Sequence, residues 1–284
     1  MKCMKAITTK TKRAMKIRNA NGCKLVQFHG LDRYEHIFHF VTTREGGISE
    51  GAYATLNPSR YTDDDPAHIQ QNLSRLAQAI HLQPTQILLP HQVHQDRILD
   101  ITPAFLSQSQ SSQLAQLEGI DALLTAVPHV CVAISTADCV PVLLYAPDRQ
   151  VVAAVHAGWR GTVLRIAQRC VEQIQQQYQC DPARLQAAIG PSISQAAFEV
   201  GEEVVEAFRE AGFELSSLMY RHPDSQKAHI DLWKANQLQL LEAGLQTAHI
   251  EIAGICTYQQ VDQFFSARRL GIRSGRILSG IYLR

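Results

Sequence analysis

Four segments of the chain place apolar residues at the three- and four-residue spacing of an amphipathic helix. The clearest opens with Asp65 as an N-cap residue and Pro66 at the first helical position, a combination that favours helix initiation. Its apolar face then consists of Ile69, Leu73, Leu76 and Ile80. The same spacing predicts further helices after Gly161 and over residues 201–212 and 231–243.

Strand patterns concentrate in the middle of the chain. Short, β-branched, apolar runs occupy residues 130–137, 140–146 and 151–157, with a turn predicted at 147–150. Further candidate strands are residues 37–42, 186–189 and 250–255. Because these runs are apolar at nearly every position, we expect strands that are buried on both faces. The predicted fold class is α+β, a single domain in which mixed, partly antiparallel sheets are covered by helices.

The charge distribution divides the chain into a basic start and a more acidic remainder. The net charge is only +1, yet residues 1–24 contain eight Lys or Arg and no acidic residue. We expect residues 1–30 to be a disordered N-terminal segment, or else a transit-like or polyanion-binding arm, and residues 31–284 to form one catalytic domain. The balanced net charge indicates no nucleic acid partner, and no apolar run is long enough to predict a membrane span.

The seven cysteines are odd in number, widely spaced and free of any Cys-x-x-Cys pair. This pattern differs from a disulfide framework and indicates a reducing, cytoplasmic location. The Ser- and Gln-rich stretch 107–116 predicts a surface loop within the domain.

Cys139 and His156 are the residues with the most distinctive chemistry. Cys139 follows one apolar run, His156 ends another, and His94 stands upstream in the sequence Pro-His-Gln-Val-His. One thiolate and two imidazoles form a complete set of protein ligands for a catalytic zinc with an open fourth position. The same residues also fit a metal-free Cys139–His156 nucleophile pair. Asp138 is a candidate for orienting a metal-bound histidine, or else it caps a turn.

A possible anion-binding turn follows His156. The sequence His-Ala-Gly-Trp-Arg-Gly over residues 156–161 predicts a strand end, a tight turn and a helix N-terminus, where free amide groups bind anions. Arg160 adds a charge suited to phosphate or carboxylate. Alternatively, the two glycines serve only the backbone angles of the turn. Arg44, in a Gly-containing loop after strand 37–42, adds another guanidinium, so these loops fit an anionic substrate.

In chain order, these segments resemble the YfiH-like family, which is also described as the polyphenol oxidase or laccase-domain family, as peptidoglycan editing factors and as purine nucleoside phosphorylases. The most specific match is Ala-Asp-Cys at 137–139 followed by His-Ala-Gly-Trp-Arg-Gly at 156–161. The other matching pieces are residues 42–49, 55–57, 92–94, 121–125, 189–193, 198–201, 256–257 and 264–269. The resemblance extends from about residue 37 to the end of the sequence.

The resemblance implies that one zinc ion, or alternatively copper, is bound by His94, Cys139 and His156. It also implies a four-layer domain with a mixed β-sandwich between helices. The implied activity is phosphorolysis of purine nucleosides, with adenosine deamination and methylthioadenosine phosphorolysis as related reactions, so the expected partners are purine nucleosides and phosphate. The candidate catalytic residues are Cys139, His156 and Asp138, and the candidate substrate-binding residues are Arg44, Asn57 and Arg160.

Two positions depart from the family pattern. Ala267 stands where the family usually has an aromatic residue or histidine. The segment Asn-Pro-Ser-Arg-Tyr at 57–61 stands where a glycine usually follows the asparagine. Both departures concern the substrate pocket rather than the metal ligands.

Two other functions are compatible with these residues. A copper-dependent, laccase-like polyphenol oxidase needs many imidazoles, usually in His-x-His pairs, whereas this chain has twelve histidines and no such pair. Trace copper-dependent oxidation is still compatible with one mixed thiolate–imidazole site. A metal-free Cys139–His156 hydrolase would act on a cell-wall precursor, as in peptidoglycan editing. The sequence fits a monomer or a homodimer.

Overall fold

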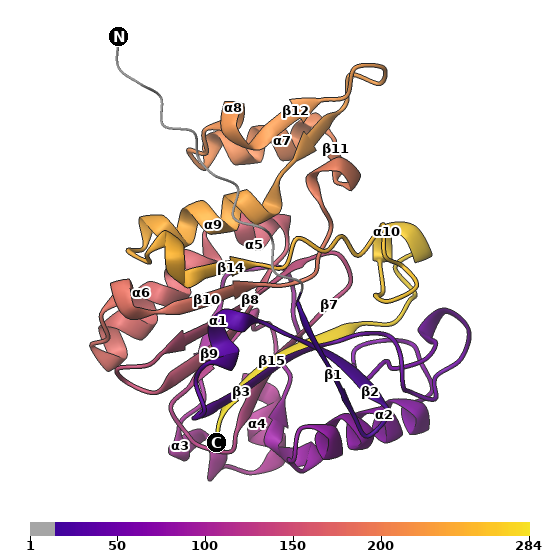
Figure 1. Ribbon diagram of the computed structural model, residues 1–284, viewed down its shortest axis with the longest axis vertical. Coiled ribbons are helices and arrows are strands. Elements are labelled where there is room, and N and C mark those ends of the chain that lie inside the picture. The colour runs from indigo at the N-terminus through magenta and orange to yellow at the C-terminus, as the bar shows by residue number, and fades with distance from the viewer. Residues whose placement is uncertain (1–14) are drawn as a thin grey trace.

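The structure of this protein is a computed structural model that describes residues 15–284 (Figure 1). These residues form two six-stranded mixed sheets and a separate three-stranded sheet. The first sheet comprises, in spatial order, β1 (Lys16–Ala20), β2 (Cys23–Gln27), β3 (Ile37–Thr42), β15 (Ile277–Leu283), β7 (Cys131–Thr136) and β4 (Ile87–Leu88). The second comprises β14 (Ile250–Ile252), β10 (Gln186–Ile189), β8 (Val140–Ala146), β9 (Val151–Ala157), β6 (Ala122–Thr125) and β5 (Ile98–Asp100).

Helices cover the outer face of each large sheet, which produces four layers (Figure 1). Helix α2 (Pro66–Ala79) packs on the first sheet, and α6 (Ile166–Tyr178) and α9 (Leu232–Glu242) pack on the second. The remaining helices are α1 (His29–Asp32), α3 (Pro103–Leu106), α4 (Gln110–Gln116), α5 (Trp159–Val163), α7 (Glu202–Glu210), α8 (Leu215–Leu218) and α10 (Ala267–Leu270). The three-stranded sheet consists of β11 (Glu199–Val200), β13 (Ala228–Ile230) and β12 (Met219–Arg221). The predicted α+β class and the implied four-layer sandwich are confirmed.

The continuous apolar runs of the central strands serve two cores at once. In β7, Val132 and Ile134 face the layer between the two sheets, whereas Cys131 and Ala133 face the core under α2. Every residue of β8 and β9 is also buried, and neighbouring residues face opposite sides of the second sheet. This explains why these strands show no polar alternation in the sequence.

Two of the four predicted helix starts are confirmed by side-chain caps, whereas the segment after Gly161 is divided between α5 and α6. The Asp65 carboxylate accepts a hydrogen bond from the Ala67 amide at 2.8 Å, and Asp231 accepts one from the Lys234 amide at 3.0 Å. Helix α7 begins with Glu202, whose negative charge favours a helix N-terminus.

The stretch 107–116 differs from the predicted surface loop, because residues 110–116 form helix α4. Ser109 caps it by accepting a hydrogen bond from the Ser112 amide at 3.3 Å. Glutamine is a good helix former, so a Ser/Gln composition does not by itself exclude a helix once a cap is present.

The expected boundary between residues 30 and 31 also needs correction. Strands β1 and β2 lie before it, and β2 pairs with β3 through Leu25 opposite Thr42. Cys23 and Leu25 are fully buried, so residues from Lys16 onward belong to the first sheet. The part of the expected basic segment before residue 15 lies outside the described residues.

All six cysteines between residues 15 and 284 are free, as their spacing predicts. Across the same residues, none of the helices combines the length and apolar character needed to cross a bilayer.

His39 is a buried titratable group on β3 that links stability to pH. Its side chain is 1% exposed, and its Nε2 accepts a hydrogen bond from the Phe28 amide at 2.8 Å. Burial is the main cause that lowers the pKa of His39 from 6.5 to about 4. Unfolded chains therefore bind this proton more readily than folded ones, so stability is lost as the pH falls from 6.5 toward 4.

We predict that replacing His39 with Gln, which keeps an acceptor for the Phe28 amide, removes this pH dependence. Between pH 6.5 and 4, the unfolding free energy of the unmodified protein should fall by about 3 kcal/mol more than that of His39→Gln. Urea denaturation over a pH series measures the difference. His36→Gln, at an exposed position, should keep the original pH slope; identical slopes for His39→Gln and the unmodified protein would contradict the prediction.

Candidate metal centre

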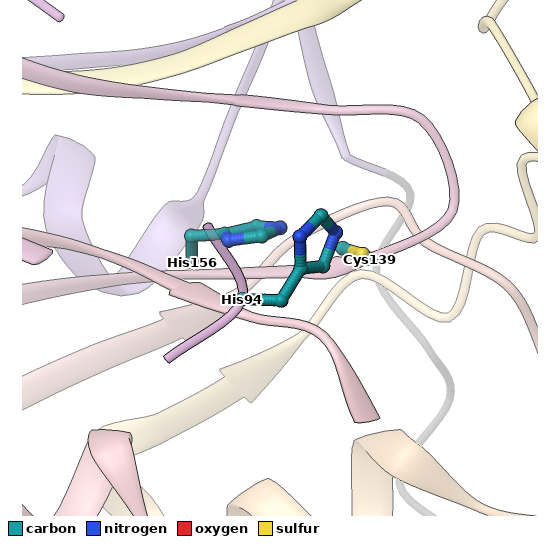
Figure 2. A group of neighbouring side chains, drawn as sticks. All are labelled: His94, Cys139 and His156. Carbon is teal, nitrogen blue, oxygen red and sulfur yellow. The ribbon is translucent and has the colours of Figure 1, made fainter. Parts of the chain in front are cut away.

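The three predicted metal ligands come from separate segments and meet at the open end of the β8–β9 hairpin. His94 lies in the loop after β4 with a left-handed φ of 62°, Cys139 lies in the turn between β7 and β8, and His156 lies in β9. Pro141 pairs with His156, which brings the nearby Cys139 beside the imidazole. The candidate ligand atoms lie within 4.8 Å of one another, and Figure 2 shows the side chains clustered together.

A fully buried carboxylate, Asp121, holds both histidines of this group. Its Oδ1 accepts hydrogen bonds from His156 Nδ1 at 2.7 Å and from the His94 amide at 3.0 Å. Its Oδ2 accepts from the amides of Gln95 at 2.8 Å and Val93 at 3.3 Å. Since Nδ1 of His156 is occupied, its Nε2 is the atom left for a metal, as in carboxylate–histidine–metal arrangements.

Charges within the group favour its ionised forms. Burial raises the pKa of the Cys139 thiol, but the charges and hydrogen bonds of His156 and His94 outweigh it and lower this pKa to about 6. Burial lowers the pKa of His156, whereas Cys139 and Asp121 raise it to about 9. Both shifts favour the Cys139 thiolate, the form that binds metals and also the form that attacks electrophiles.

The residues present fit a metal ion. One thiolate and two imidazoles match the three-ligand sets of catalytic zinc sites, and copper accepts the same donors. Gly158 leaves room for them, because a β-carbon there would lie 2.9 Å from Cys139 Sγ and 3.2 Å from His94 Cδ2. Among residues 15–284, this is the one cluster of three His, Cys, Asp or Glu side chains with metal-binding spacing.

The three candidate ligands line a cavity of about 270 Å³. The other lining residues are Tyr61, His91, Gln92, Ser135, Thr136, Ala137, Ala267, Ile272 and Arg276. The Gln92 side chain is fixed by Ser135, whose amide donates to Gln92 Oε1 at 2.8 Å. The cavity thus presents the candidate ligands on one side and polar, aromatic and cationic groups on the others.

Asp138 does not orient a histidine, contrary to one of its two predicted roles. Its carboxylate accepts hydrogen bonds from Thr257 Oγ1 at 2.6 Å, Ser266 Oγ at 3.0 Å and the Arg268 amide at 2.7 Å. These contacts hold the residues on both sides of Ala267, which lines the cavity. The histidine is oriented instead by Asp121, whose location before strand β6 resembles that of Asp138 before β8.

Arg44 and Asn57, two of the predicted substrate-binding residues, direct their polar groups to the protein itself. The Arg44 guanidinium donates to the carbonyls of Ala54 at 2.7 Å and Val261 at 2.9 Å. Asn57 is fully buried, and its Oδ1 accepts from the Arg276 amide at 3.0 Å. Neither residue lines the cavity.

Arg160, the third predicted substrate-binding residue, is exposed at the start of α5 and lies over the Trp159 ring, 4.3 Å from its centroid. It does not line the cavity. The arginine that does line it is Arg276, which the sequence analysis did not select. Burial lowers the pKa of Arg276, and the negative charges of Cys139 and Asp138 partly restore it.

Comparisons with known proteins identify the family of this chain. Residues 38–284 match the family model described as "Multi-copper polyphenol oxidoreductase laccase". Over 260 residues the chain is 45% identical to a Bacteroides thetaiotaomicron protein named purine nucleoside phosphorylase, covering 92% of this chain and 96% of that protein. It is 42% identical over 248 residues to adenosine deaminase RL5 of an unknown prokaryotic organism, covering 87% of this chain and 94% of that protein.

A solved structure shows the same fold. The crystal structure of hypothetical protein YfiH from Bacillus licheniformis matches with a TM-score of 0.85 at 28% identity, covering 94% of this chain and 99% of that one. The resemblance inferred from the sequence motifs is therefore confirmed.

We predict that Asp121→Asn weakens zinc binding by about 10- to 100-fold, because the His156 ring loses the carboxylate that fixes its orientation. Competition with a chromogenic chelator measures this affinity. Asp100→Asn is the matched control, since Asp100 on β5 accepts a hydrogen bond from Tyr178 at 2.7 Å and does not line the cavity. Unchanged zinc affinity in folded Asp121→Asn would show that the carboxylate has no such role.

Proposed function

Because the chain belongs to the family described as multi-copper polyphenol oxidoreductase laccase, and because its relatives include proteins named purine nucleoside phosphorylase and adenosine deaminase, we propose a specific activity within that family. The protein is a zinc-dependent purine nucleoside phosphorylase with adenosine deaminase and methylthioadenosine phosphorylase activity. It works in the cytoplasm as a monomer or homodimer, on purine nucleosides and phosphate.

The observation that carries this proposal is the cluster of His94, Cys139 and His156 at the wall of the cavity. Zinc bound there would supply a Lewis acid that polarises the group it contacts. Asp121 supports this role by keeping the Nδ1 proton of His156 engaged, so that Nε2 remains available.

The remaining cavity residues suit an anionic second substrate. Arg276 brings a half-buried positive charge to the cavity, although its guanidinium also donates to the carbonyls of Ser274 at 2.6 Å and Ile272 at 3.0 Å. In this proposal Asn57 acts by holding the Arg276 backbone, and Arg44 by tethering the loops around residues 54 and 261. Arg160 has no hydrogen bond or ion pair within the described residues, so its guanidinium is free to meet phosphate at the surface.

Asp138 is proposed as a positioning residue. Its bonds to Ser266 and to the Arg268 amide fix the backbone on either side of Ala267. This wall of the cavity lies next to Cys139, so a change at Asp138 would alter the shape of the site as well as its charge.

Two observations favour other reactions, namely copper-dependent oxidation and metal-free hydrolysis. The family description names copper chemistry, but residues 15–284 contain one candidate metal cluster, whereas a laccase needs several coppers. The lowered pKa of Cys139 would also suit a metal-free hydrolase. Iodoacetamide labelling distinguishes the zinc enzyme from the thiol hydrolase, because bound zinc protects Cys139 in the first, whereas Cys139 stays reactive in a metal-free hydrolase.

The proposal predicts that zinc-loaded protein converts inosine to hypoxanthine only with phosphate, and converts adenosine partly to inosine. Cys139→Ala should lose at least about 100-fold in kcat/KM, because a zinc ligand is removed. Cys180→Ala, a buried cysteine outside the cavity, should retain activity.

Liquid chromatography identifies the products, and elemental analysis of the same samples measures their metal content. Absence of free base and inosine with stoichiometric zinc would refute the proposal. Oxidation of phenols that requires added copper would support the laccase alternative instead.

A further inference from the structure

A second histidine–carboxylate pair lies at the same cavity as the candidate metal ligands. His91 and Glu118 form an isolated β-bridge, in which the His91 amide donates to Leu117 O and the Gly119 amide donates to His91 O, both at 3.0 Å. This bridge holds the two side chains next to each other, and His91 Nδ1 is hydrogen-bonded to Glu118 Oε1. The backbone therefore presets the pairing before any substrate binds.

The His91 ring is part of the cavity wall. His91 lines it together with Tyr61, whose ring stacks on the imidazole with centroids 4.7 Å apart. Within the described residues, His91 Nε2 has no hydrogen-bond or ion-pair partner. With Nδ1 bonded to a carboxylate and the ring held by stacking, Nε2 is the atom that can exchange a proton with a bound molecule.

The other titratable groups of the cavity are unsuited to donate and regain a proton at neutral pH. Those groups are Tyr61, His94, Cys139, His156 and Arg276. His94, Cys139 and His156 are the candidate metal ligands. Burial raises the pKa of Tyr61 above its already high ordinary value, and an arginine keeps its proton. His91 is the imidazole that remains.

We propose that His91, oriented by Glu118, is the catalytic acid that protonates the purine as it leaves the ribose. This inference rests on the proposed phosphorolysis. The C1′–N9 bond breaks and its electron pair stays on the purine, while a phosphate oxygen forms the new bond to C1′. The Nε2 proton of His91 moves to purine N7, and the proton lost by hydrogen phosphate returns through solvent to His91. Atoms and charge are thereby balanced over one turnover.

Glu118 has two tasks in this step. Its bond to Nδ1 fixes the orientation of the ring, and it leaves the opposite nitrogen, Nε2, as the one open to a bound purine. Both side chains are partly exposed, at 42% for His91 and 62% for Glu118, so solvent can return the proton between turnovers.

The test compares two nucleosides that differ in their need for an acid. Inosine releases a purine that requires a proton, whereas 7-methylinosine carries a fixed positive charge on its imidazole ring and releases a neutral base without one. His91→Gln should lower kcat/KM for inosine by about 100-fold or more and leave 7-methylinosine cleavage unchanged. Glu118→Gln should show a smaller loss, again confined to inosine.

His36→Gln, at an exposed position outside the cavity, is the control and should cleave both nucleosides normally. Melting temperature and zinc content should match the unmodified protein in every variant. Equal losses on both nucleosides in His91→Gln, or no loss on inosine, would overturn the role of His91. Failure of the unmodified protein to cleave either nucleoside would instead overturn the phosphorolysis itself, and with it this inference.

Discussion

The buried carboxylate of Asp121 is the contact on which the candidate metal centre depends. It accepts from three consecutive amides of the loop that carries His94 and from the imidazole of His156, while its own carbonyl accepts from the His156 amide. Burying this carboxylate without these hydrogen-bond partners would cost free energy. The folded protein therefore keeps the loop that carries His94 next to strand β9. The pairing of β8 with β9 then places Cys139. The geometry suited to a metal is thus built into the polypeptide.

Asp138 performs the matching task for the opposite wall of the cavity. Its carboxylate gathers Thr257, Ser266 and the Arg268 amide, all more than a hundred residues away in the chain. The two aspartates therefore have different roles at the cavity. Asp121 holds the candidate metal ligands, and Asp138 holds the segment around Ala267, which forms another part of the cavity wall.

Strong local signals made much of this arrangement predictable from sequence. The long apolar strands β7, β8 and β9, the capped helix α2 and the three candidate ligands are all visible in short stretches of residues. The roles of Asp121 and Arg276 were missed because their partners lie far away in the sequence. Asp121 begins the matching segment 121–125, but nothing in that segment indicates which groups its carboxylate binds. Arg44 and Asn57 were selected for their chemistry, but folding directs that chemistry to carbonyls and amides of distant loops.

Strand β15 completes the first sheet. It pairs with β3 on one side and with β7 on the other, so residues 277–283 join two parts of the first sheet that are otherwise unconnected. Until β15 pairs with them, β3 and β7 each have one edge without a neighbouring strand. The pairing of β15 with β3 leaves no room for a side chain at Gly280, because a β-carbon there would come within 2.7 Å of the Phe40 ring. Completion of this sheet therefore depends on contacts between residues far apart in the sequence, and it removes two strand edges that would otherwise be open to pairing with another chain.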